Sequence, residues 1–379
     1  LPGFVNAHTH LPMTLMRGYG GGCDLHTWLN QYIFPAEARL DSRAVAAGAG
    51  LGLAEMIASG VTCVADMYMH TGTIAEQILE AGISANLSCG GVYFGAPEDF
   101  SPETCGDCRN QAALTEEWHG AGAGQILVDA SVHGEYTSNP PLWRWMAEYA
   151  AEHRLGMHVH VSETQSEHQA SLERWGKTPI QALDGCGVWD CGRSLAAHCV
   201  YTTEEDWALM AEKGISCVHN PWSNLKLGSG VAPIPAMMRA GVNVALGTDG
   251  MSSHNSADLF SDIKLAAVLH NGVERDPMAV NAWAALEMAT VNGARALGRD
   301  TGVIAPGKTA DLILVDLSAP NLIPCHDPVE DLVFSAHGSN VEMNMARGQV
   351  IYEKGSFLTL DLERVRWEVE HYALPLIFG

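Results

Sequence analysis

The chain has few basic residues and no long hydrophobic run. Its 379 residues include 21 Lys and Arg against 44 Asp and Glu, which gives a formal net charge of −23 at pH 7. Because this charge repels phosphate, nucleic acids and anionic membrane surfaces are poor candidate partners. No stretch of about 18 uncharged apolar residues exists, so we expect no membrane-spanning helix. A small neutral or cationic molecule is the expected partner, and self-association stays open.

Signals for export and for disulfide bonds are also lacking. The start Leu1-Pro2-Gly3 has neither a basic segment nor an initiator Met, so we expect no export signal, with the natural N-terminus left open. Most of the ten cysteines stand singly in apolar segments, as Cys63 and Cys199 do, which is typical of buried thiols in a reducing cytosol. Only Cys105 and Cys108 have the spacing of metal ligands. A cytoplasmic protein is therefore expected.

Strand-length apolar segments alternate with helical patterns along most of the chain. The expected strands are residues 4–7, 61–65, 83–88, 126–132, 155–161, 195–200, 215–218 and 242–246. The expected helices include residues 43–58, 74–81, 142–152, 204–212 and 233–240. This alternation predicts an α/β fold with parallel strands and right-handed crossovers, and eight units make a closed (β/α)8 TIM-type barrel. A doubly wound open sheet is the alternative, but no Gly-x-Gly-x-x-Gly follows the first strand.

The pattern changes after an expected helix at residues 280–297. Short strands without intervening helices follow at residues 303–311, 312–316, 343–347 and 349–352, and an amphipathic helix at residues 362–372 closes the chain. These strands predict part of a small β-sandwich. The expected domains are the barrel at 1–300, the sandwich segment at 301–360 and the C-terminal helix and tail at 361–379.

Metal-binding side chains stand at the exits of several predicted strands. In a barrel these exits share one rim, which is where active sites lie. A single histidine at such a place is usually structural, but their repetition favours a metal centre, because imidazole and carboxylate suit zinc or iron(II). The exit residues are His8, His10, Asp66, His133, His160, His198, His219 and Asp249.

The motifs at these exits resemble the amidohydrolase superfamily, and within it the methylthioadenosine/S-adenosylhomocysteine deaminase group with its chlorohydrolase-like relatives. The resemblance covers essentially the whole chain. It rests on Pro2-Gly-Phe-Val-Asn-Ala-His8-Thr-His10, His160-Val-Ser-Glu163, Ala197-His198-Cys199, His219-Asn-Pro-Trp-Ser-Asn-Leu-Lys-Leu-Gly228, Gly247-Thr-Asp249-Gly250 and Gly302-Val-Ile-Ala-Pro-Gly-Lys308-Thr-Ala-Asp311. Family members also carry sandwich strands ahead of this point, so either the chain is trimmed or its sandwich is incomplete.

The resemblance implies one divalent metal ion, with zinc favoured and iron second. Its expected ligands are His8, His10, His160 and Asp249. Members with two metals carry a bridging lysine on strand four, and residues 126–132 contain no lysine. His158 alternates with His160 on the same strand and could replace it. We prefer His160, because it is nearer the strand exit and three residues before Glu163.

The resemblance also implies the reaction, which is hydrolytic deamination of an adenine nucleoside. Glu163 is expected to carry protons, and His198 and Asp249 to assist catalysis. Trp28 and Glu37 match positions that contact the nucleoside sugar, although Trp28 could be a core aromatic and Glu37 a surface charge. The base contacts are expected from His133 and Ser253, with His219 as a further candidate or a support for the following loop.

The 5′-substituent of the nucleoside is the least defined part of the prediction. Relatives that process S-adenosylhomocysteine resemble one another in having an arginine after strand three, whereas this chain has Cys89-Gly90-Gly91. Only Arg109 could substitute. Adenosine, 5′-deoxyadenosine or 5′-methylthioadenosine are therefore expected before S-adenosylhomocysteine.

Other functions stay open at this point. The same metal motifs would serve a triazine, pyrimidine or guanine amino- or chlorohydrolase. A non-catalytic scaffold with this fold is a third reading, although such a protein has no need of the full ligand set. A nucleotide-deaminase zinc site built from His133-Gly-Glu135 and Cys105-x-x-Cys108 is disfavoured, because that motif has the opposite order and a proline before its first cysteine.

Overall fold

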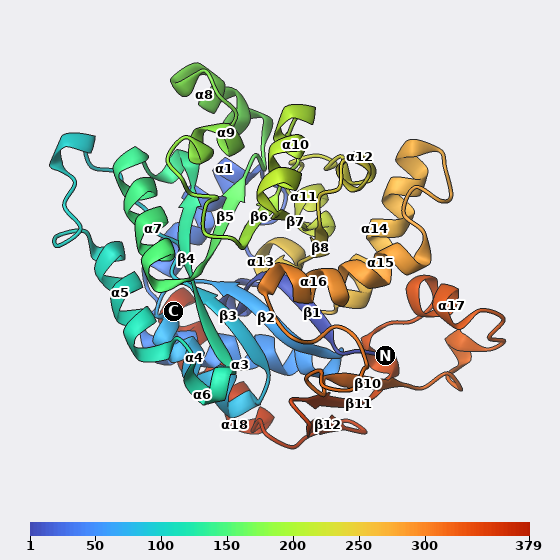
Figure 1. The fold of residues 1–379 in the computed structure, drawn as a ribbon. Coiled ribbons are helices and arrows are strands. Elements are labelled where there is room, and N and C mark those ends of the chain that lie inside the picture. The colour runs from blue at the N-terminus through green and yellow to red at the C-terminus, as the bar shows by residue number, and fades with distance from the viewer.

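The strands form the curved parallel sheet that the sequence predicts (Figure 1). This computed structural model describes residues 1–379. The sheet has nine strands in the order β8-β7-β6-β5-β4-β3-β2-β1-β9. They are β1 Phe4–His10, β2 Val61–Met67, β3 Ser84–Ser88, β4 Ile126–Gly134, β5 Gly156–Val161, β6 Ser194–His198, β7 Ile215–His219, β8 Val244–Leu246 and β9 Asp249–Gly250.

The first and last strands of this order are two halves of one barrel strand. Only Gly247 and Thr248 separate β8 from β9, and β8 pairs with β7 while β9 pairs in parallel with β1. The Asn6 side chain bridges the interruption, since its Oδ1 accepts the Thr248 N–H at 3.0 Å and its Nδ2 donates to Thr248 Oγ1 at 2.8 Å. The ring is thereby closed, and the predicted (β/α)8 architecture is confirmed.

Helices cover the outside of the sheet and close several crossovers. Those up to β9 are α1 Leu25–Trp28, α2 Phe34–Glu37, α3 Ser42–Ala58, α4 Thr71–Ala81, α5 Gly106–Trp118, α6 Ala121–Gly124, α7 Pro140–His153, α8 Gln165–Trp175, α9 Pro179–Asp184, α10 Glu204–Lys213, α11 Pro221–Lys226 and α12 Ile234–Arg239. The later ones are α13 Met251–His254, α14 Leu259–Glu274, α15 Ala282–Met288, α16 Val291–Leu297, α17 Pro328–Phe334, α18 Leu362–Glu368 and α19 Leu374–Phe378. None of them is both long and apolar enough to cross a membrane.

Local sequence signals explain where several of these helices begin. Thr164, Thr178 and Thr203 each precede a helix, and each hydroxyl accepts the backbone N–H three residues later in a capping box. Such caps satisfy N–H groups that have no partner within the helix. They fix the start of α8, α9 and α10 on the same rim as the strand exits.

Small apolar side chains fill the barrel below that rim. Residues from β1, β2, β6, β7 and β8 form a cluster with α16, which closes the bottom of the barrel. Gly293 of α16 lies so close to Val5 that an added Cβ would be 2.8 Å from the Val5 Cβ. The interior is therefore packed, and polar side chains are left to the C-terminal rim. The cluster consists of Val5, Ala7, Cys63, Ala65, Leu195, Val218, Ala245, Ala294, Ala296 and Leu297.

The prediction of a single helix at residues 280–297 is wrong, because the structure has two helices there. Helices α15 and α16 are separated at Ala289 and Thr290, and Thr290 has non-helical angles of φ −130° and ψ −96°. The Ala289 carbonyl accepts the N–H of Val5 at 2.8 Å. The break therefore lets the helix pair hold the first strand of the barrel.

The C-terminal strands form one small antiparallel sheet, in the order β10-β11-β12-β13. Its strands are β10 Leu312–Val315, β11 Val341–Ala346, β12 Gln349–Glu353 and β13 Ser356–Phe357. The free side of β10 is met by the first residues of the chain, through an antiparallel bridge between Pro2 and Leu312. The strand expected at 303–311 is wrong: Pro306 and Gly307, the latter at φ +86°, turn the backbone there.

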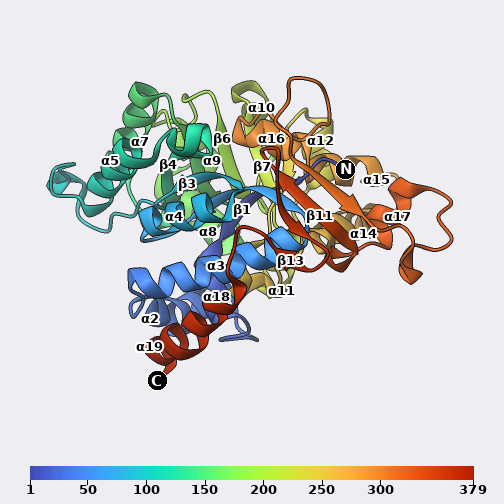
Figure 2. The same ribbon diagram turned by 90° about the horizontal axis from the view of Figure 1, so that it is seen from below.

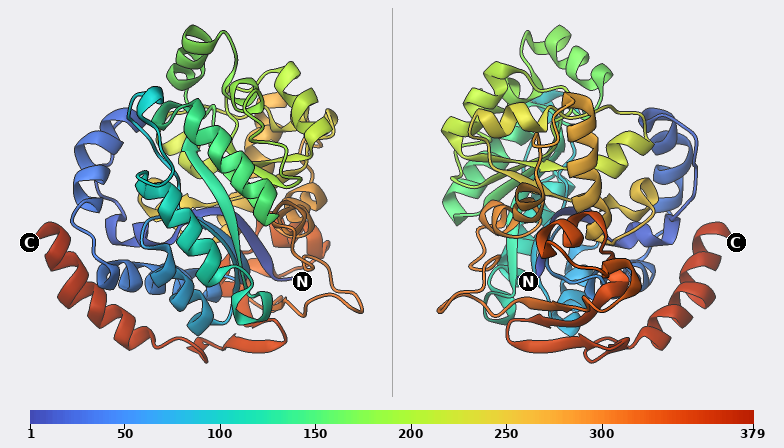
Figure 3. Two further views of the ribbon diagram at one scale, coloured as in Figure 1. Left: turned by 60° about the vertical axis from the view of Figure 1, so that its left-hand side comes forward. Right: turned by 90° about the vertical axis from the view of Figure 1, so that its right-hand side faces the viewer.

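The last helices run along the outside of the barrel beside the first ones. Figures 2 and 3 show α18 and α19 against α3 and α2, from which they are far apart in the sequence. The helix expected at 362–372 extends further than predicted, through a π-helical turn at Val369–Ala373 into α19. The chain termini are thus both tied to the barrel.

Asn344 links the small sheet to the barrel and offers a test of this arrangement. Its buried Nδ2 donates to the carbonyls of Ile57 at 2.9 Å and Val61 at 3.0 Å. Asn344→Ala should lower the free energy of unfolding by about 1–3 kcal/mol, because two buried carbonyls lose their donor. The exposed Glu342→Ala on the same strand should change it by less than about 0.5 kcal/mol. Urea unfolding followed by circular dichroism measures both, and equal effects would contradict the link.

Candidate metal centre and active site

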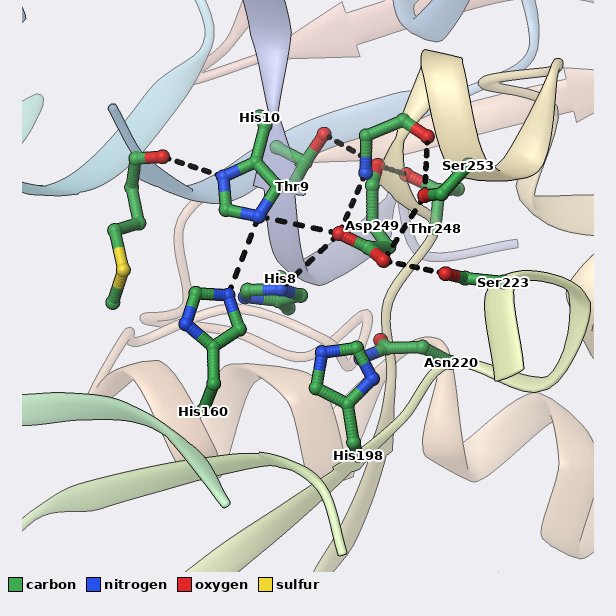
Figure 4. Close-up of polar contacts among 12 residues, drawn as sticks. His8, Thr9, His10, His160, His198, Asn220, Ser223, Thr248, Asp249 and Ser253 are labelled. Atoms are coloured by element: carbon green, nitrogen blue, oxygen red, sulfur yellow. Dashed lines mark hydrogen bonds and ion pairs between the residues drawn. The ribbon is translucent and has the colours of Figure 1, made fainter. Parts of the chain in front are cut away.

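Four side chains from three strands that are far apart in the sequence converge at the rim of the barrel (Figure 4). His8 and His10 belong to β1, His160 to β5 and Asp249 to β9. The Oδ1 atom of Asp249 lies 3.2 Å from His10 Nε2 and 3.5 Å from His8 Nε2. His160 Nε2 lies 3.3 Å from His10 Nε2. The structure thus brings together the four residues that the sequence nominates as metal ligands.

Backbone carbonyls fix how two of these imidazoles point. His10 Nδ1 lies 2.5 Å from the carbonyl oxygen of Met67, and His160 Nδ1 lies 2.6 Å from that of His133. Because a carbonyl can only accept, each Nδ1 carries a hydrogen, which leaves each Nε2 as the nitrogen that can bind an ion. Such partners behind metal-binding histidines orient the ring toward the ion.

A series of hydrogen-bonded side chains fixes the orientation of the His8 imidazole in the same way. Its Nδ1 lies 2.8 Å from His158 Nε2, and His158 Nδ1 lies 3.4 Å from the Ser88 hydroxyl. With the hydrogens on both Nδ1 atoms, His8 Nε2 keeps its lone pair. His158 therefore contacts the candidate ligand His8 from behind.

The donor set fits a divalent cation. His8 Nε2 is fully buried and has no hydrogen-bond partner, which is costly for a polar atom unless an ion is bound there. Burial lowers the pKa of His8 to about 4 and that of His160 well below its usual value, so both are neutral, as metal binding requires.

The carboxylate of Asp249 supplies negative charge to this cluster. Burial alone would raise its pKa, but the adjacent imidazoles of His10 and His8 outweigh burial and hold the pKa well below its usual value. Burial lowers the pKa of His10, but the contact with Asp249 outweighs burial and raises this pKa to about 9. The cluster thus attracts positive charge, and Ser223 and Ser253 hold the other oxygen of Asp249, at 2.6 and 3.0 Å.

Glu163 and His198 stand beside the cluster. Glu163 is 6% exposed, so it is not a solvated loop carboxylate. Its Oε2 lies 3.7 Å from His198 Nε2, and its Oε1 accepts from the Ser229 hydroxyl at 3.2 Å. Burial raises the pKa of Glu163. His198 Nε2 is close enough to His8 and His160 for the three to share an ion, which makes His198 a rival ligand.

The backbone is strained where it presents these groups. His198 has φ +75° and Asp249 has φ +61°, in the left-handed region that ordinary residues avoid. Ser162, just before Glu163, has φ +49°. Strain of this kind persists where the surrounding structure enforces it, and it is typical of functional sites.

The two residues proposed for the sugar are both buried near the rim. Glu37 is 8% exposed and accepts the Tyr68 hydroxyl at 2.6 Å, so the reading as a surface charge is wrong. Burial raises its pKa. The Tyr68 ring lies 6.3 Å from that of His10, which places Glu37 beside the metal centre. Trp28 is 4% exposed, and its Nε1 donates to the Tyr19 carbonyl at 3.3 Å.

The residues proposed for the base have different surroundings. His133 packs against His160 at 4.8 Å between ring centroids, and Thr137 holds its Nδ1 at 3.1 Å. The Ser253 hydroxyl instead faces Asp249. His219 Nε2 lies 3.0 Å from His270 Nε2 on α14, so that nitrogen is occupied within the protein. Substrate contacts by these residues stay predictions.

Sequence reasoning gave no role to three polar residues that contact the candidate catalytic groups. Ser223, Asn224 and Ser229 reach Asp249, His198 and Glu163, respectively. The first two lie within the motif that begins at His219, which was the only available signal. Their partners are 26 to 66 residues away along the chain, so the pairing was not visible in the sequence.

Comparisons with known proteins agree with this architecture. A model of the amidohydrolase family matches residues 1–351. A 5-methylthioadenosine/S-adenosylhomocysteine deaminase of Caldanaerobacter subterraneus is 42% identical over 100% of this chain and 87% of its own length. A 5′-deoxyadenosine deaminase of Methanosarcina mazei is 40% identical over 100% of this chain and 86% of its own.

A solved structure shows the same fold with a bound ion. The adenosine deaminase of Xanthomonas campestris with bound zinc is 33% identical, with a TM-score of 0.92 over 99% of this chain and 85% of that one. From the match of the family model and these full-length similarities, the chain belongs to the amidohydrolase family.

Proposed function

We propose that this protein is a metal-dependent deaminase of an adenine nucleoside, which it converts to the inosine analogue with release of ammonia. The observation that carries the proposal is the convergence of three imidazole Nε2 atoms and the Asp249 carboxylate beside the buried carboxylate of Glu163. Relatives with full-length similarity are named as deaminases of such nucleosides. The substrate is a small molecule.

The proposed cofactor is one divalent ion, zinc before iron, held by His8, His10, His160 and Asp249. Zinc is present in the solved adenosine deaminase that this chain resembles. Three nitrogens and one oxygen match the ligands that zinc and iron(II) prefer. An ion in such a site lowers the pKa of water toward neutrality.

The surrounding residues then move protons around the 6-position of the purine. Glu163 takes a proton as the water oxygen adds to C6, and it delivers that proton to a ring nitrogen. His198 Nε2 lies on the same side of the cluster, where its lone pair can accept a hydrogen bond from the attacking water and then from the hydroxyl of the tetrahedral adduct. Asp249 assists transfer of the remaining hydroxyl proton of the adduct to the amine, so that the C6–N bond breaks, ammonia leaves and the C6 carbonyl of the inosine analogue forms.

The residues near the proposed metal site favour a ribose without an acidic 5′-substituent. Glu37 can accept both ribose hydroxyls in charge-assisted hydrogen bonds. At the end of β3 the Cys89 thiol donates to Gln111 Oε1 at 3.4 Å, and Arg109 is exposed on α5, where its guanidinium donates to the Glu103 carbonyl. A carboxylate on the 5′-substituent therefore has no cationic partner from these residues.

Glu163→Gln tests proton transfer. The substitution preserves shape but cannot accept a proton, so turnover should fall by roughly 10²–10⁴-fold while metal content is unchanged. The matched control is Glu173→Gln, an exposed residue of α8, which should retain full turnover. Steady-state ammonia release and metal analysis provide the two readouts. Near-normal turnover of Glu163→Gln would remove Glu163 from the mechanism.

The substrate class can be tested with a panel of adenosine, 5′-deoxyadenosine, 5′-methylthioadenosine, S-adenosylhomocysteine, adenine and guanine. The first three should be deaminated with the highest kcat/KM, because a site built for ribose hydroxyls rejects ligands that lack them. Glu37→Ala should raise KM for the nucleosides, whereas Glu76→Ala, exposed on α4, should not. A faster reaction with S-adenosylhomocysteine, or equal rates with adenine and adenosine, would contradict the assignment.

A further inference from the structure

One short segment contacts all three candidate catalytic side chains from behind. Helix α11 supplies Ser223 to Asp249 and Asn224 to His198, and Ser229 in the turn after α11 reaches Glu163. Lys226 of the same helix is anchored on the Ser252 carbonyl at 2.8 Å. Among these contacts, the hydrogen bond of Asn224 can decide which ring nitrogen of His198 carries the hydrogen.

Two amide side chains face the same ring nitrogen of His198. Asn224 Oδ1 lies 2.8 Å from His198 Nδ1, and Asn220 Nδ2 lies 3.3 Å from it. Both asparagines and His198 are buried, so water does not compete. An amide oxygen can only accept, and it is the nearer of the two atoms, so Nδ1 carries the hydrogen. His198 Nε2 then keeps its lone pair.

We infer that Asn224 is a positioning residue that holds His198 in the tautomer with hydrogen on Nδ1 and a free lone pair on Nε2. The expected effect on kcat rests on the proposed function, whereas the tautomer of His198 does not. In the other tautomer, Nε2–H would point at Glu163 Oε2, which lies 3.7 Å away. Glu163 would then accept from His198 rather than from water, and the two bases would block each other.

The geometry around His198 makes the choice of tautomer depend on Asn224. The ring is at the end of β6 on a residue with φ +75°, so its backbone is fixed. Asn220 offers a donor to Nδ1 and therefore supports the opposite tautomer. Removing the Asn224 oxygen should leave that donor as the nearest partner, and the hydrogen of His198 should move to Nε2.

The test uses the zinc-loaded full chain with ¹⁵N-labelled histidine. Asn224→Leu keeps the approximate volume but removes the acceptor, whereas Asn224→Asp keeps an oxygen in the same place. The ¹⁵N NMR signals of His198 are those that disappear in His198→Gln. Their chemical shifts should show Nδ1–H in the wild type and Nε2–H in Asn224→Leu. In the same variant kcat should fall by roughly 10²-fold, with KM changed less than about threefold. Asn224→Asp should restore the Nδ1–H signal and most of kcat.

Asn344→Ala is the matched control, since it removes another buried asparagine away from the rim. It should lower stability without changing the His198 signals or kcat. An unchanged tautomer in Asn224→Leu, or a loss of kcat in Asn224→Asp as large as in Asn224→Leu, would overturn the inference. Because the nitrogen shifts need no substrate, they test the role of Asn224 even if none of the nucleosides is deaminated.

Discussion

The hydrogen bonds behind the rim histidines are the interactions on which the site depends. Each Nδ1 atom of His8, His10 and His160 meets a group that directs the ring, so the three Nε2 atoms point at one place next to Asp249. An imidazole with the opposite tautomer could not bind an ion there. The burial that makes these contacts strong also keeps His8 and His160 neutral.

The barrel brings these residues together at one of its two ends. Its lower interior is filled by small apolar side chains and closed by α16, so the polar residues gather at the opposite rim. There the chain accepts strained backbone at His198 and Asp249, which a packed scaffold can enforce. The Asn6 side chain bridges the interruption between β8 and β9, next to the Asp249 carboxylate. Stability and function are thus divided between the two ends of the barrel.

Much of this arrangement could be predicted from the sequence, because it depends on local patterns. Strand-length apolar runs and capping threonines mark the barrel units, and the spacing of His8 and His10 places both on one face. Other features depend on contacts between distant segments. The helix break at Thr290 accompanies a hydrogen bond from the Val5 N–H to the Ala289 carbonyl. Asn224 likewise contacts His198, which is 26 residues away. Periodicity carries no information about such pairs.

The central claim is that one divalent ion is bound by His8, His10, His160 and Asp249. Anomalous diffraction from crystals of the purified protein, recorded at the zinc and iron absorption edges, tests it directly. The account predicts a single peak, within bonding distance of the three Nε2 atoms and Asp249 Oδ1. Two peaks among these residues, or a single peak bonded to His198 or His158 in place of His160, would contradict it.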